Sequence, residues 1–502
     1  MAMALSWRGG WRARAARALL LALWGLAVLG LSRLLAPRAA PSRAPRPAAP
    51  PTYWQLAHKQ RSRYNHSSQT KACARAPSAC ELVLSDAYWQ TLRSSGGDVL
   101  LYGAYLDVRS ASRLGPAVRL LAVRGRTNRT TTTHCQLWYE DRADDVVVEV
   151  VEHTPVWNSK WSRPRAGELQ PYLLACVLPV AARAKRPAAV SLVERPCDQA
   201  TNCLQVQFDV PPDCSQKELA VCVKGLDFPR DDLSVRLVEW IELVRLLGAD
   251  QVFFYQVQVH PNMSKVLEYY RARGAVEVTP ITLPAERGAG RGWAPRLRDK
   301  YLKKKKTMHE RRMELVSYND CLYRHMYQYR WLALLDVDEV IVPLQDPDWS
   351  SLLKRVLPLA ELTRATWKSP LSSYHVSNLY YLETPELEPG VPQHMYMLQQ
   401  VYRVRNLSAP GTHVKAFHET GRVLTLHNHF PRVCLSGACT SHAIAPAQAR
   451  LQHYRGARGP GGGGGGGAPV RDTALRRWAA RLVPRVAAVL ADLQLTPPES
   501  LA

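Results

Sequence analysis

The sequence has no acidic residue in its first 80 positions, where thirteen lysines and arginines lie. A large part of the formal net charge of +24 therefore falls in a stretch that has little capacity to form a folded core. The rest of the chain contains no zinc-finger spacing and no other nucleic-acid-binding motif. The strong positive charge therefore does not indicate a nucleic-acid partner.

Cysteine pairs with zinc-binding spacing are also missing. None of the eleven cysteines lies in a Cys-x-x-Cys motif, so a structural zinc site is not indicated. Irregularly spaced cysteines are typical of proteins from oxidising compartments, and we expect disulfides with one thiol left over. The spacing alone does not assign the pairing. Four Asn-x-Ser/Thr glycosylation sequons fit the same compartment: Asn65, Asn128, Asn262 and Asn406.

The sequence also lacks an uncharged run as long as an ordinary membrane-spanning helix. Near the N-terminus an uncharged stretch covers residues 18–32, and Arg33 interrupts it before three further apolar residues. A signal peptide is one interpretation, because the run is short for a membrane span. A signal-anchor over residues 18–36 is favoured, because Arg33 stands where the small-residue cleavage site should lie. The basic residues 1–17 would then form a cytoplasmic tail, which places the body in the lumen in a type II orientation.

The rest of the sequence divides into segments that differ in composition and in the spacing of their apolar residues. Residues 37–97 begin with a Pro/Ala/Arg-rich segment and form a predicted stem. Residues 98–212 hold short β-type runs separated by turns, which predicts a β-rich accessory domain without catalytic features. Residues 213–456 alternate strands with helices, which predicts a parallel, Rossmann-like α/β domain. A Gly-rich linker over 457–470 and an amphipathic, Arg-rich helix within 471–502 follow, and we expect the helix to pack on the α/β domain, with a lumenal partner as the alternative.

The α/β pattern is centred on Arg330–Pro343, with the sequence RWLALLDVDEVIVP. An apolar run predicts a buried strand, and Asp336 and Asp338 follow at its carboxyl end, where ligands bind in open α/β sheets. In Asp-x-Asp the alternating pleat of a strand points both carboxylates the same way. Two oxygen ligands at one edge suit Mg²⁺ or Mn²⁺, with phosphate oxygens completing the coordination. The alternative is an acidic triplet that only ends a strand.

Four segments together resemble glycosyltransferase family 92, formerly a domain of unknown function. They are LVEWIELVRLLGADQVFFYQ, YNDCLYRHMYQYRWLALLDVDEVIVP, LHNHF and HYR, in this order, and the resemblance covers roughly residues 98–455. Within the family, the chain looks most like vertebrate, especially avian, β-1,4-galactosyltransferases that extend terminal galactose on N-glycans. The resemblance implies a GT-A fold, a UDP-sugar donor, a divalent ion (typically Mn²⁺) and inversion at the anomeric carbon.

The resemblance also implies roles for single residues. Asp336 and Asp338 match the metal-binding Asp-x-Asp of the family, and Glu339 is expected to support them without binding the metal. A C-terminal histidine commonly adds a further metal ligand, for which His427 ranks before His429 and His453. Nucleotide-sugar binding would involve two residues of the preceding helix, Asn319 and Asp320. For Asp320 the alternative is a helix-surface carboxylate paired with Arg324.

An inverting transfer needs a carboxylate that takes the proton of the acceptor hydroxyl. The sequence does not choose among four glutamates downstream of the Asp-x-Asp motif: Glu383, Glu386, Glu388 and Glu419. Tyr374, Trp367 and Tyr380 are candidates for stacking on sugar rings, with a core role as the alternative.

We therefore expect a Golgi type II membrane protein that transfers galactose from UDP-galactose, with Mn²⁺ or Mg²⁺, to galactose-terminated N-glycans of glycoproteins. Three alternatives stay open: a different acceptor such as core fucose, a catalytically inactive glycan-binding relative, and a metal-dependent phosphate-ester hydrolase. The last would need more clustered carboxylates and histidines than this region shows. A homodimer is an open alternative to a monomer.

Overall fold

The structure is a computed structural model that describes residues 70–71, 73–125, 131–141, 145–164, 168–282, 284, 308–364, 370–408, 411–455 and 468–495. These residues all belong to one compact unit that spans Pro51–Ala502. The predicted tail, the anchor over 18–36, most of the stem and of the Gly-rich linker, and the sequons at Asn65 and Asn128 lie outside the described residues. No helix in the described ranges is long and apolar enough to cross a membrane.

The first described part of the chain is a sheet of nine strands in the order β1-β6-β5-β8-β9-β3-β4-β7, with β2 paired to β3 and β6 also paired to β7. Most of its pairings are antiparallel, and the part of the chain with β-type runs is β-rich, as predicted. Its strands are β1 (Thr70–Lys71), β2 (Gln90–Ser94), β3 (Gly97–Asp107), β4 (Ala117–Gly125), β5 (His134–Trp138), β6 (Val146–Pro155), β7 (Leu169–Val177), β8 (Ala189–Val193) and β9 (Leu204–Gln207).

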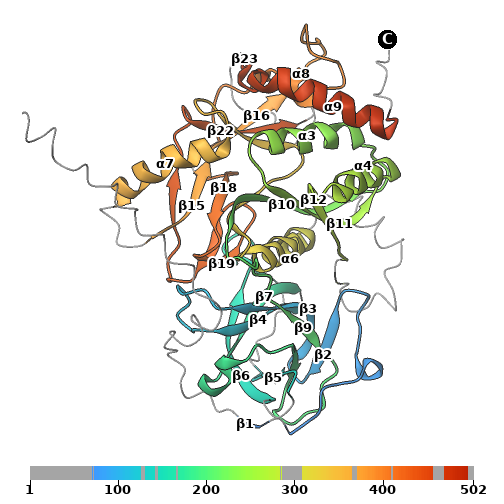
Figure 1. Ribbon diagram of the computed structural model, residues 1–502, viewed down its shortest axis with the longest axis vertical. Helices are drawn as coiled ribbons and strands as arrows, with labels where there is room; N and C mark the ends of the chain where they lie inside the picture. Colours follow the sequence, from blue (N-terminus) through green and yellow to red (C-terminus); the bar gives the residue numbers. More distant parts are fainter. Residues whose placement is uncertain are drawn as a thin grey trace, which may run out of the picture. The chain divides into compact units, whose positions relative to one another are not determined.

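The α/β part is centred on β10 (Lys217–Phe228), which pairs in parallel with β11 (Gln251–Val259) and β13 (Tyr329–Leu334). Strand β12 (Val276–Pro280) extends the parallel sheet beyond β11. Helices α3 (Ser234–Leu246), α4 (Pro261–Ala272) and α6 (Met308–His325) alternate with these strands, which confirms the predicted β-α-β pattern (Figure 1). The first of them ends where Gly248 adopts φ +106, a conformation that glycine takes at little cost.

The chain after β13 adds strands that the sequence did not predict in detail. Antiparallel strands β18 (Lys415–Glu419) and β15 (Leu371–Val376), and then β21 (Thr440–Ala443), continue the central sheet beyond β13. A second sheet has the order β14-β22-β16-β17-β23, and β19 (Val423–Leu426) pairs with β20 (Pro431–Cys434). The strands of the second sheet are β14 (Glu339–Pro343), β22 (Ala449–Arg455), β16 (Asn378–Leu382), β17 (Tyr402–Arg403) and β23 (Val470–Arg471).

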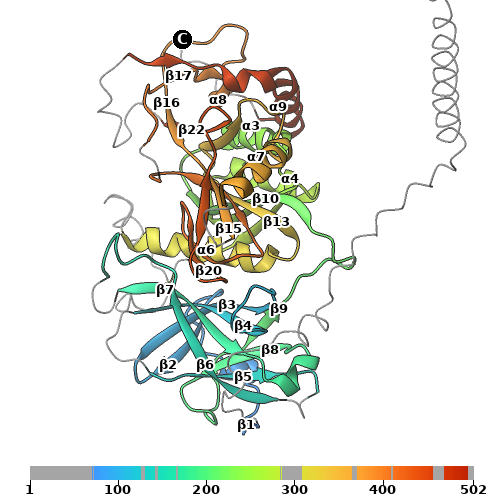
Figure 2. The same ribbon diagram turned by 90° about the vertical axis from the view of Figure 1, so that its left-hand side faces the viewer.

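The described residues also form three further α-helices and short 3₁₀ helices. Helix α7 (Trp349–Arg364) follows β14, and α8 (Tyr396–Gln399) follows β16; short 3₁₀ turns include Ala79–Glu81, Val180–Ala184 and Ala474–Trp478. The C-terminal helix α9 (Ala479–Leu493) lies beside α3 in both views, and its buried residues belong to the same hydrophobic core as those of α3 (Figures 1 and 2). The predicted packing of the C-terminal helix on the α/β part is confirmed.

Helix α6 contacts both parts of the described structure. One hydrophobic cluster joins its residues to Trp89 and Tyr105 of the β-rich part and to Leu332 and Leu334 of β13. The helix that leads into the Asp-x-Asp strand is therefore fixed from both parts.

Four disulfides confirm the expectation of an oxidised protein, but the prediction of a single leftover thiol is wrong. The pairs are Cys73–Cys197, Cys135–Cys176, Cys222–Cys321 and Cys434–Cys439. Three thiols remain: Cys80, Cys203 and Cys214. At Cys203, a hydrogen bond with Ser191 lowers the thiol pKa, but burial outweighs it and raises the pKa overall.

Candidate functional site

The Asp-x-Asp motif forms a turn between β13 and β14 and does not continue the strand. The Glu339 N–H donates to the Asp336 carbonyl oxygen at 3.0 Å, and the Asp336 N–H donates to a Glu339 carboxylate oxygen at 3.3 Å. The alternating pleat therefore does not apply, and the expectation that both aspartates point the same way is wrong. The side chain of Asp336 is 18 % exposed and that of Asp338 is 46 % exposed.

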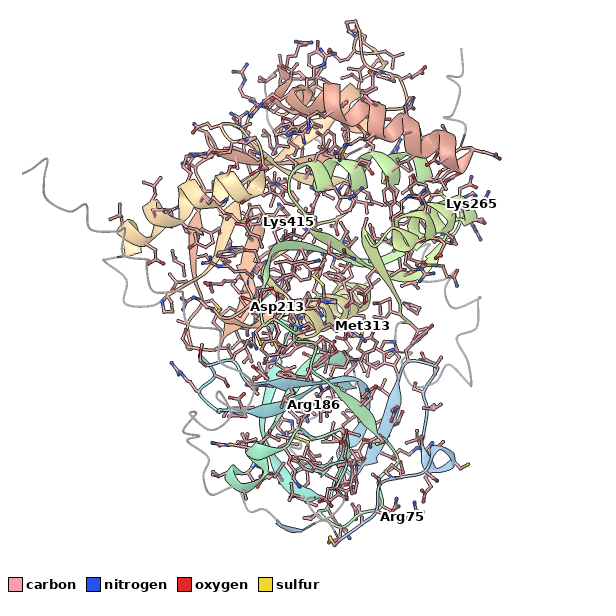
Figure 3. All side chains as sticks on the ribbon, viewed as in Figure 1. Arg75, Arg186, Asp213, Lys265, Met313 and Lys415 are labelled. Carbon is pink, nitrogen blue, oxygen red and sulfur yellow. A yellow bond between two sulfur atoms is a disulfide. The ribbon has the colours of Figure 1, made fainter. Side chains whose placement is uncertain are left out.

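Asp336 faces two lysines from neighbouring strands of the central sheet. Its carboxylate lies 3.2 Å from Nζ of Lys224 on β10 and 3.6 Å from Nζ of Lys415 on β18. The Tyr318 hydroxyl of α6 is a further neighbour at 3.4 Å. Lys415 is buried and also pairs with Glu339 at 3.0 Å (Figure 3 labels Lys415 in the α/β part). The motif is thus embedded in a buried network of positive and negative charges.

The charges of this network determine the protonation of the lysines. Burial lowers the pKa of Lys224, but the carboxylates of Asp336, Glu314 and Glu339 outweigh it and raise the pKa above its ordinary value. The pKa of Lys415 is raised by the same balance of burial against carboxylates. Both lysines therefore carry positive charge at neutral pH.

Asp338 lies beside His453, which was third among the histidine candidates. His453 is opposite Glu339 in the antiparallel pairing of β22 with β14, and opposite Tyr380 in the parallel pairing of β22 with β16. Its Nε2 is 3.4 Å from an Asp338 carboxylate oxygen, and its Nδ1 is 3.1 Å from a Glu339 carboxylate oxygen. The Tyr380 ring centroid is 5.1 Å from that of His453. The partly exposed carboxylate of Asp338 and the imidazole of His453 therefore lie within ion-pair distance of each other.

The first-ranked histidine, His427, lies in a group of aromatic rings. Its ring centroid is 4.0 Å from that of Trp161, 5.3 Å from that of Phe430 and 5.4 Å from that of Trp157. Neither ring nitrogen has a hydrogen-bond partner among the described residues. Burial first, and then neighbouring positive charge, lower the pKa of His427 to about 3, so the ring is neutral. The structure therefore brings His453, and not His427, beside the Asp-x-Asp motif.

The pair predicted to bind the nucleotide sugar, Asn319 and Asp320, is buried. The Asn319 amide donates to the carbonyl oxygens of Leu315 and Leu426, and accepts from the Leu426 N–H at 2.9 Å, which fixes β19 to α6. Asp320 accepts hydrogen bonds from the Tyr105 hydroxyl and, at 2.6 Å, from the Tyr255 hydroxyl.

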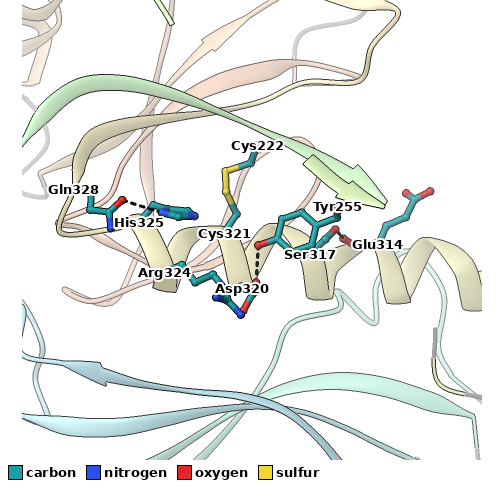
Figure 4. The surroundings of a disulfide bond; sticks show 9 residues. All are labelled: Cys222, Tyr255, Glu314, Ser317, Asp320, Cys321, Arg324, His325 and Gln328. Carbon is teal, nitrogen blue, oxygen red and sulfur yellow. Dashed lines mark hydrogen bonds and ion pairs between the residues drawn. A yellow bond between two sulfur atoms is a disulfide. The ribbon is translucent and has the colours of Figure 1, made fainter. Parts of the chain in front are cut away.

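Asp320 also pairs with Arg324 at 2.8 Å, one helical turn along α6 and beside the Cys222–Cys321 disulfide (Figure 4). This is the ion pair weighed as the alternative from the sequence, although the carboxylate is buried and not at the helix surface. Each residue thus holds neighbouring elements together from a buried position.

The four glutamates considered as general base differ in their surroundings. Glu388 is buried and pairs with Arg471 at 2.8 Å, and Glu419 pairs with Arg422 at 2.6 Å. Glu383 and Glu386 are exposed after the end of β16, the strand beside His453. Burial raises the pKa of Tyr396, a hydrogen bond with Gln400 and the charge of Arg236 oppose the rise, and the negative charges of Glu383 and Asp338 add to it.

Two predicted glycosylation sites lie in the described residues. Asn406 is exposed in the loop after β17. The amide nitrogen of Asn262, at the start of α4, donates to an Asp232 carboxylate oxygen at 2.7 Å. Of the predicted aromatic candidates, Tyr374 is buried, Tyr380 borders His453, and Trp367 lies outside the described residues.

Sequence reasoning did not identify Lys224, Lys415 or Trp161. A lysine at the end of the apolar run LAVCVK was a signal for Lys224, because a buried strand rarely carries an unpaired charge. For Lys415 and Trp161 no local pattern gives a signal, since each reaches the site through pairing of distant segments.

Three comparisons with known proteins complete the description. A search of curated protein sequences found no match. Among solved structures, the chain is similar to the apo structure of WbbM, a bifunctional glycosyltransferase, with 12% identity and a TM-score of 0.19 over 38% of this chain and 26% of that chain. It thus spans about a quarter of that protein's length. The first 349 residues of S. aureus TarS, in complex with UDP-GlcNAc, match with 11% identity and a TM-score of 0.22 over 56% of this chain and 68% of that chain.

The family model of Glycosyltransferase family 92 matches residues 217–459, a range that includes Lys224, Asp336, Asp338, Lys415 and His453. This range begins at the central strand β10 and extends beyond β22, so it contains both strands that bring His453 and the Asp-x-Asp turn together. Residues 217–459 of the chain therefore belong to glycosyltransferase family 92.

Proposed function

We propose that this glycosyltransferase has a GT-A fold and transfers galactose from UDP-galactose, with inversion, in β-1,4 linkage to galactose-terminated N-glycans. The observation that supports the proposal is the meeting of Asp338 and His453 beside a pair of charged lysines at the carboxyl end of β13. A sugar donor with a diphosphate presents negative charge, which such a site can bind. The choice of galactose, of the linkage and of the acceptor rests on the sequence resemblance.

We propose a divalent ion, Mn²⁺ or Mg²⁺, held by Asp338 and His453. No group of three or more histidine, cysteine, aspartate or glutamate side chains in the described ranges could hold a metal ion by itself. Two protein ligands nevertheless fit Mg²⁺ or Mn²⁺, because such ions are often bound by one or two side chains, with substrate phosphates and water completing the octahedron. The bound ion would neutralise charge on the diphosphate leaving group.

The chain's own residues have separate tasks in this proposal. Glu339 holds the turn and orients His453 through Nδ1, which leaves Nε2 directed at Asp338. Lys224 and Lys415 hold Asp336 in place. Glu383 takes the proton of the acceptor hydroxyl, because it is exposed and directly follows the strand beside His453.

We further propose a lumenal Golgi location with an N-terminal anchor over residues 18–36. The four disulfides support an oxidising compartment, and the basic N-terminal flank supports the type II orientation.

The test is transfer from a panel of UDP-sugars to a galactose-terminated biantennary N-glycan, with Mn²⁺ or with EDTA. We expect transfer with UDP-galactose that EDTA abolishes. Asp338→Ala and His453→Ala, which each remove a proposed metal ligand, should each lower kcat/KM by about a hundredfold or more, the size of effect seen when a group that stabilises transition-state charge is lost. His427→Ala should leave the Mn²⁺ concentration for half-maximal activity unchanged. Glycan binding without transfer or UDP release from any donor would instead indicate a catalytically inactive relative.

The same assay identifies the base. Glu383→Gln should lower kcat with little change in donor KM, whereas Glu386→Gln, an equally exposed glutamate three residues on, is the matched control. Equal losses in both variants, or none in Glu383→Gln, would rule out Glu383 as the base.

A further inference from the structure

An exposed tryptophan lies on the loop between β6 and β7, in the β-rich part of the chain. The side chain of Trp161 is 46 % exposed, whereas Trp157 on the same loop is buried. A half-exposed indole offers a flat apolar face together with an N–H donor, a combination that is enriched at binding surfaces. The contacts of Trp161 lead from this loop toward the Asp-x-Asp turn.

Hydrogen bonds hold residues 157–162 of this loop against one another and against α6. The Trp157 indole N–H donates to the Ser162 carbonyl oxygen at 3.0 Å, and the Trp161 N–H donates to the Asn158 carbonyl oxygen at 3.0 Å. Arg312 of α6 is buried and donates to the Glu168 carboxylate at 2.8 Å and to the Ser162 hydroxyl at 3.3 Å. A buried arginine with two such partners restrains the loop, so Trp161 is positioned before any ligand arrives.

Three rings fix the orientation of the Trp161 indole. It is close to perpendicular to Trp157, His427 and Phe430, at interplanar angles of 88°, 82° and 89°. The rings of His427 and Phe430 are themselves nearly parallel, at 15°. Edge-to-face contacts of this kind are favourable arrangements of aromatic rings. We call these four residues, Trp157, Trp161, His427 and Phe430, the aromatic cluster.

The aromatic cluster is joined to the Asp-x-Asp turn through Asn428. This residue lies between His427 and His429, and its amide oxygen accepts a hydrogen bond from Nζ of Lys415 at 2.8 Å. The Tyr318 hydroxyl is 3.4 Å from the same oxygen and 3.4 Å from the Asp336 carboxylate. Lys415 likewise contacts Asp336. Only one side chain therefore separates Asn428 from Asp336.

The aromatic cluster and the Asp-x-Asp turn, which Asn428 connects, offer different chemistry to a ligand. The Asp-x-Asp end carries charged lysines and carboxylates, whereas the exposed end offers an indole beside neutral rings. A diphosphate fits the charged end. The C–H face of a hexopyranose fits an exposed indole, because it is apolar and flat while its hydroxyls remain at the rim in water.

We propose that Trp161 is a stacking platform for a sugar ring of the acceptor glycan, so that the β-rich part of the chain contributes to acceptor recognition. This inference rests on the proposed transfer to a glycan acceptor and adds where that acceptor binds. Galactose is a suitable occupant, since its axial C4 hydroxyl leaves a continuous C–H patch on the opposite face of the ring.

The test compares Trp161→Ala, Trp161→Phe and, as the control, Tyr88→Ala, which alters another exposed aromatic of the β-rich part. We expect Trp161→Ala to raise the KM for the galactose-terminated N-glycan about tenfold, which corresponds to about 1.4 kcal/mol. The KM for the UDP-sugar and the rate of UDP release without acceptor should not change. Trp161→Phe should retain most of the acceptor affinity, and Tyr88→Ala should match the wild type.

Each other result overturns the proposal. An unchanged acceptor KM in Trp161→Ala shows that the indole does not bind the acceptor. A rise in donor KM of equal size shows a nucleotide platform or a structural role. Should the wild type transfer no sugar at all, titration of the same N-glycan into wild type and Trp161→Ala still gives a binding comparison, so failure of the catalytic proposal and failure of the platform are separate outcomes. Trp161→Phe serves in the same comparison if Trp161→Ala does not fold.

Discussion

Lys415 shows how strongly a single buried charge is constrained in this protein. It has no exposed surface and lies between Asp336 and Glu339. Lys415→Met keeps much of the side-chain volume but leaves two carboxylates without their shared cation. Breaking a buried ion pair from one side costs about 3–5 kcal/mol, because the remaining charge stays buried.

We therefore predict a loss of about that size in the free energy of unfolding of Lys415→Met, measured by urea denaturation. Lys265→Met is the control, because Lys265 is exposed on α4 and should change stability by less than about 0.5 kcal/mol (Figure 3 labels both lysines). Equal stabilities of the two variants would show that the buried network contributes little.

Asp320 was expected to bind the nucleotide, but its buried contacts indicate that it stabilises the fold. Its carboxylate is fully buried and its described partners are Tyr105, Tyr255 and Arg324. Asp320→Asn removes the charge that pairs with Arg324 and introduces an amide N–H toward two hydroxyl donors. We predict a loss of roughly 3 kcal/mol in unfolding free energy, with the affinity for UDP unchanged in isothermal titration. Weaker UDP binding in a variant of undiminished stability would instead restore the nucleotide-binding role.

At the scale of elements, the helices and parallel strands could be predicted, and the connections at the site could not. Leu237, Ile241 and Val244 recur at helical spacing, and α3 forms where they predict it. By contrast, His453 is placed by the pairing of β22 with β14 over a separation of more than a hundred residues. Local periodicity does not contain this register, so His427, which follows an apolar run, seemed the better ligand from the sequence.

The contact between α3 and α8 makes stability depend on pH. The buried Glu239 carboxylate accepts hydrogen bonds from the N–H groups of Met397 and Leu398. Burial outweighs these bonds and raises the pKa of Glu239 to about 7 from the ordinary 4.5. The folded state therefore binds a proton more tightly than the unfolded state, and stability falls as pH rises from about 4.5 to about 7.

We predict that the wild type loses on the order of 2 kcal/mol through this group between pH 5 and pH 8. Glu239→Gln cannot ionise, so its unfolding free energy should vary less with pH, and the difference between the two proteins should grow in favour of the variant toward pH 8. Urea denaturation at both pH values measures this. Parallel pH profiles for the two proteins would contradict the prediction.

At the scale of the whole molecule, the β-rich part shares a buried network with the α/β part. Arg109 pairs with Asp107 and donates to the carbonyl oxygens of Thr420 and Val423, which lie on either side of the turn before β19. The sequence indicated an accessory segment because its strands carry no catalytic motif. Its contacts with the α/β part, such as those of Arg109 and Trp161, are revealed by no motif within the segment.

The disulfides add a constraint on the unfolded chain that differs with the length of loop they close. Cys222–Cys321 joins β10 to α6 across 99 positions, whereas Cys434–Cys439 closes a separation of 5. In the chain-entropy description, closing the longer loop stabilises by about 5 kcal/mol and the shorter by about 2 kcal/mol.

We predict that the Cys222→Ser/Cys321→Ser double variant loses more unfolding free energy than the Cys434→Ser/Cys439→Ser double variant, in denaturant melts under non-reducing conditions. Since α6 carries Tyr318 and leads into the Asp-x-Asp strand, transfer activity should fall at lower denaturant concentration in the first variant. An equal cost for both pairs would show that local packing around each disulfide, and not the restriction of the unfolded chain, sets its contribution.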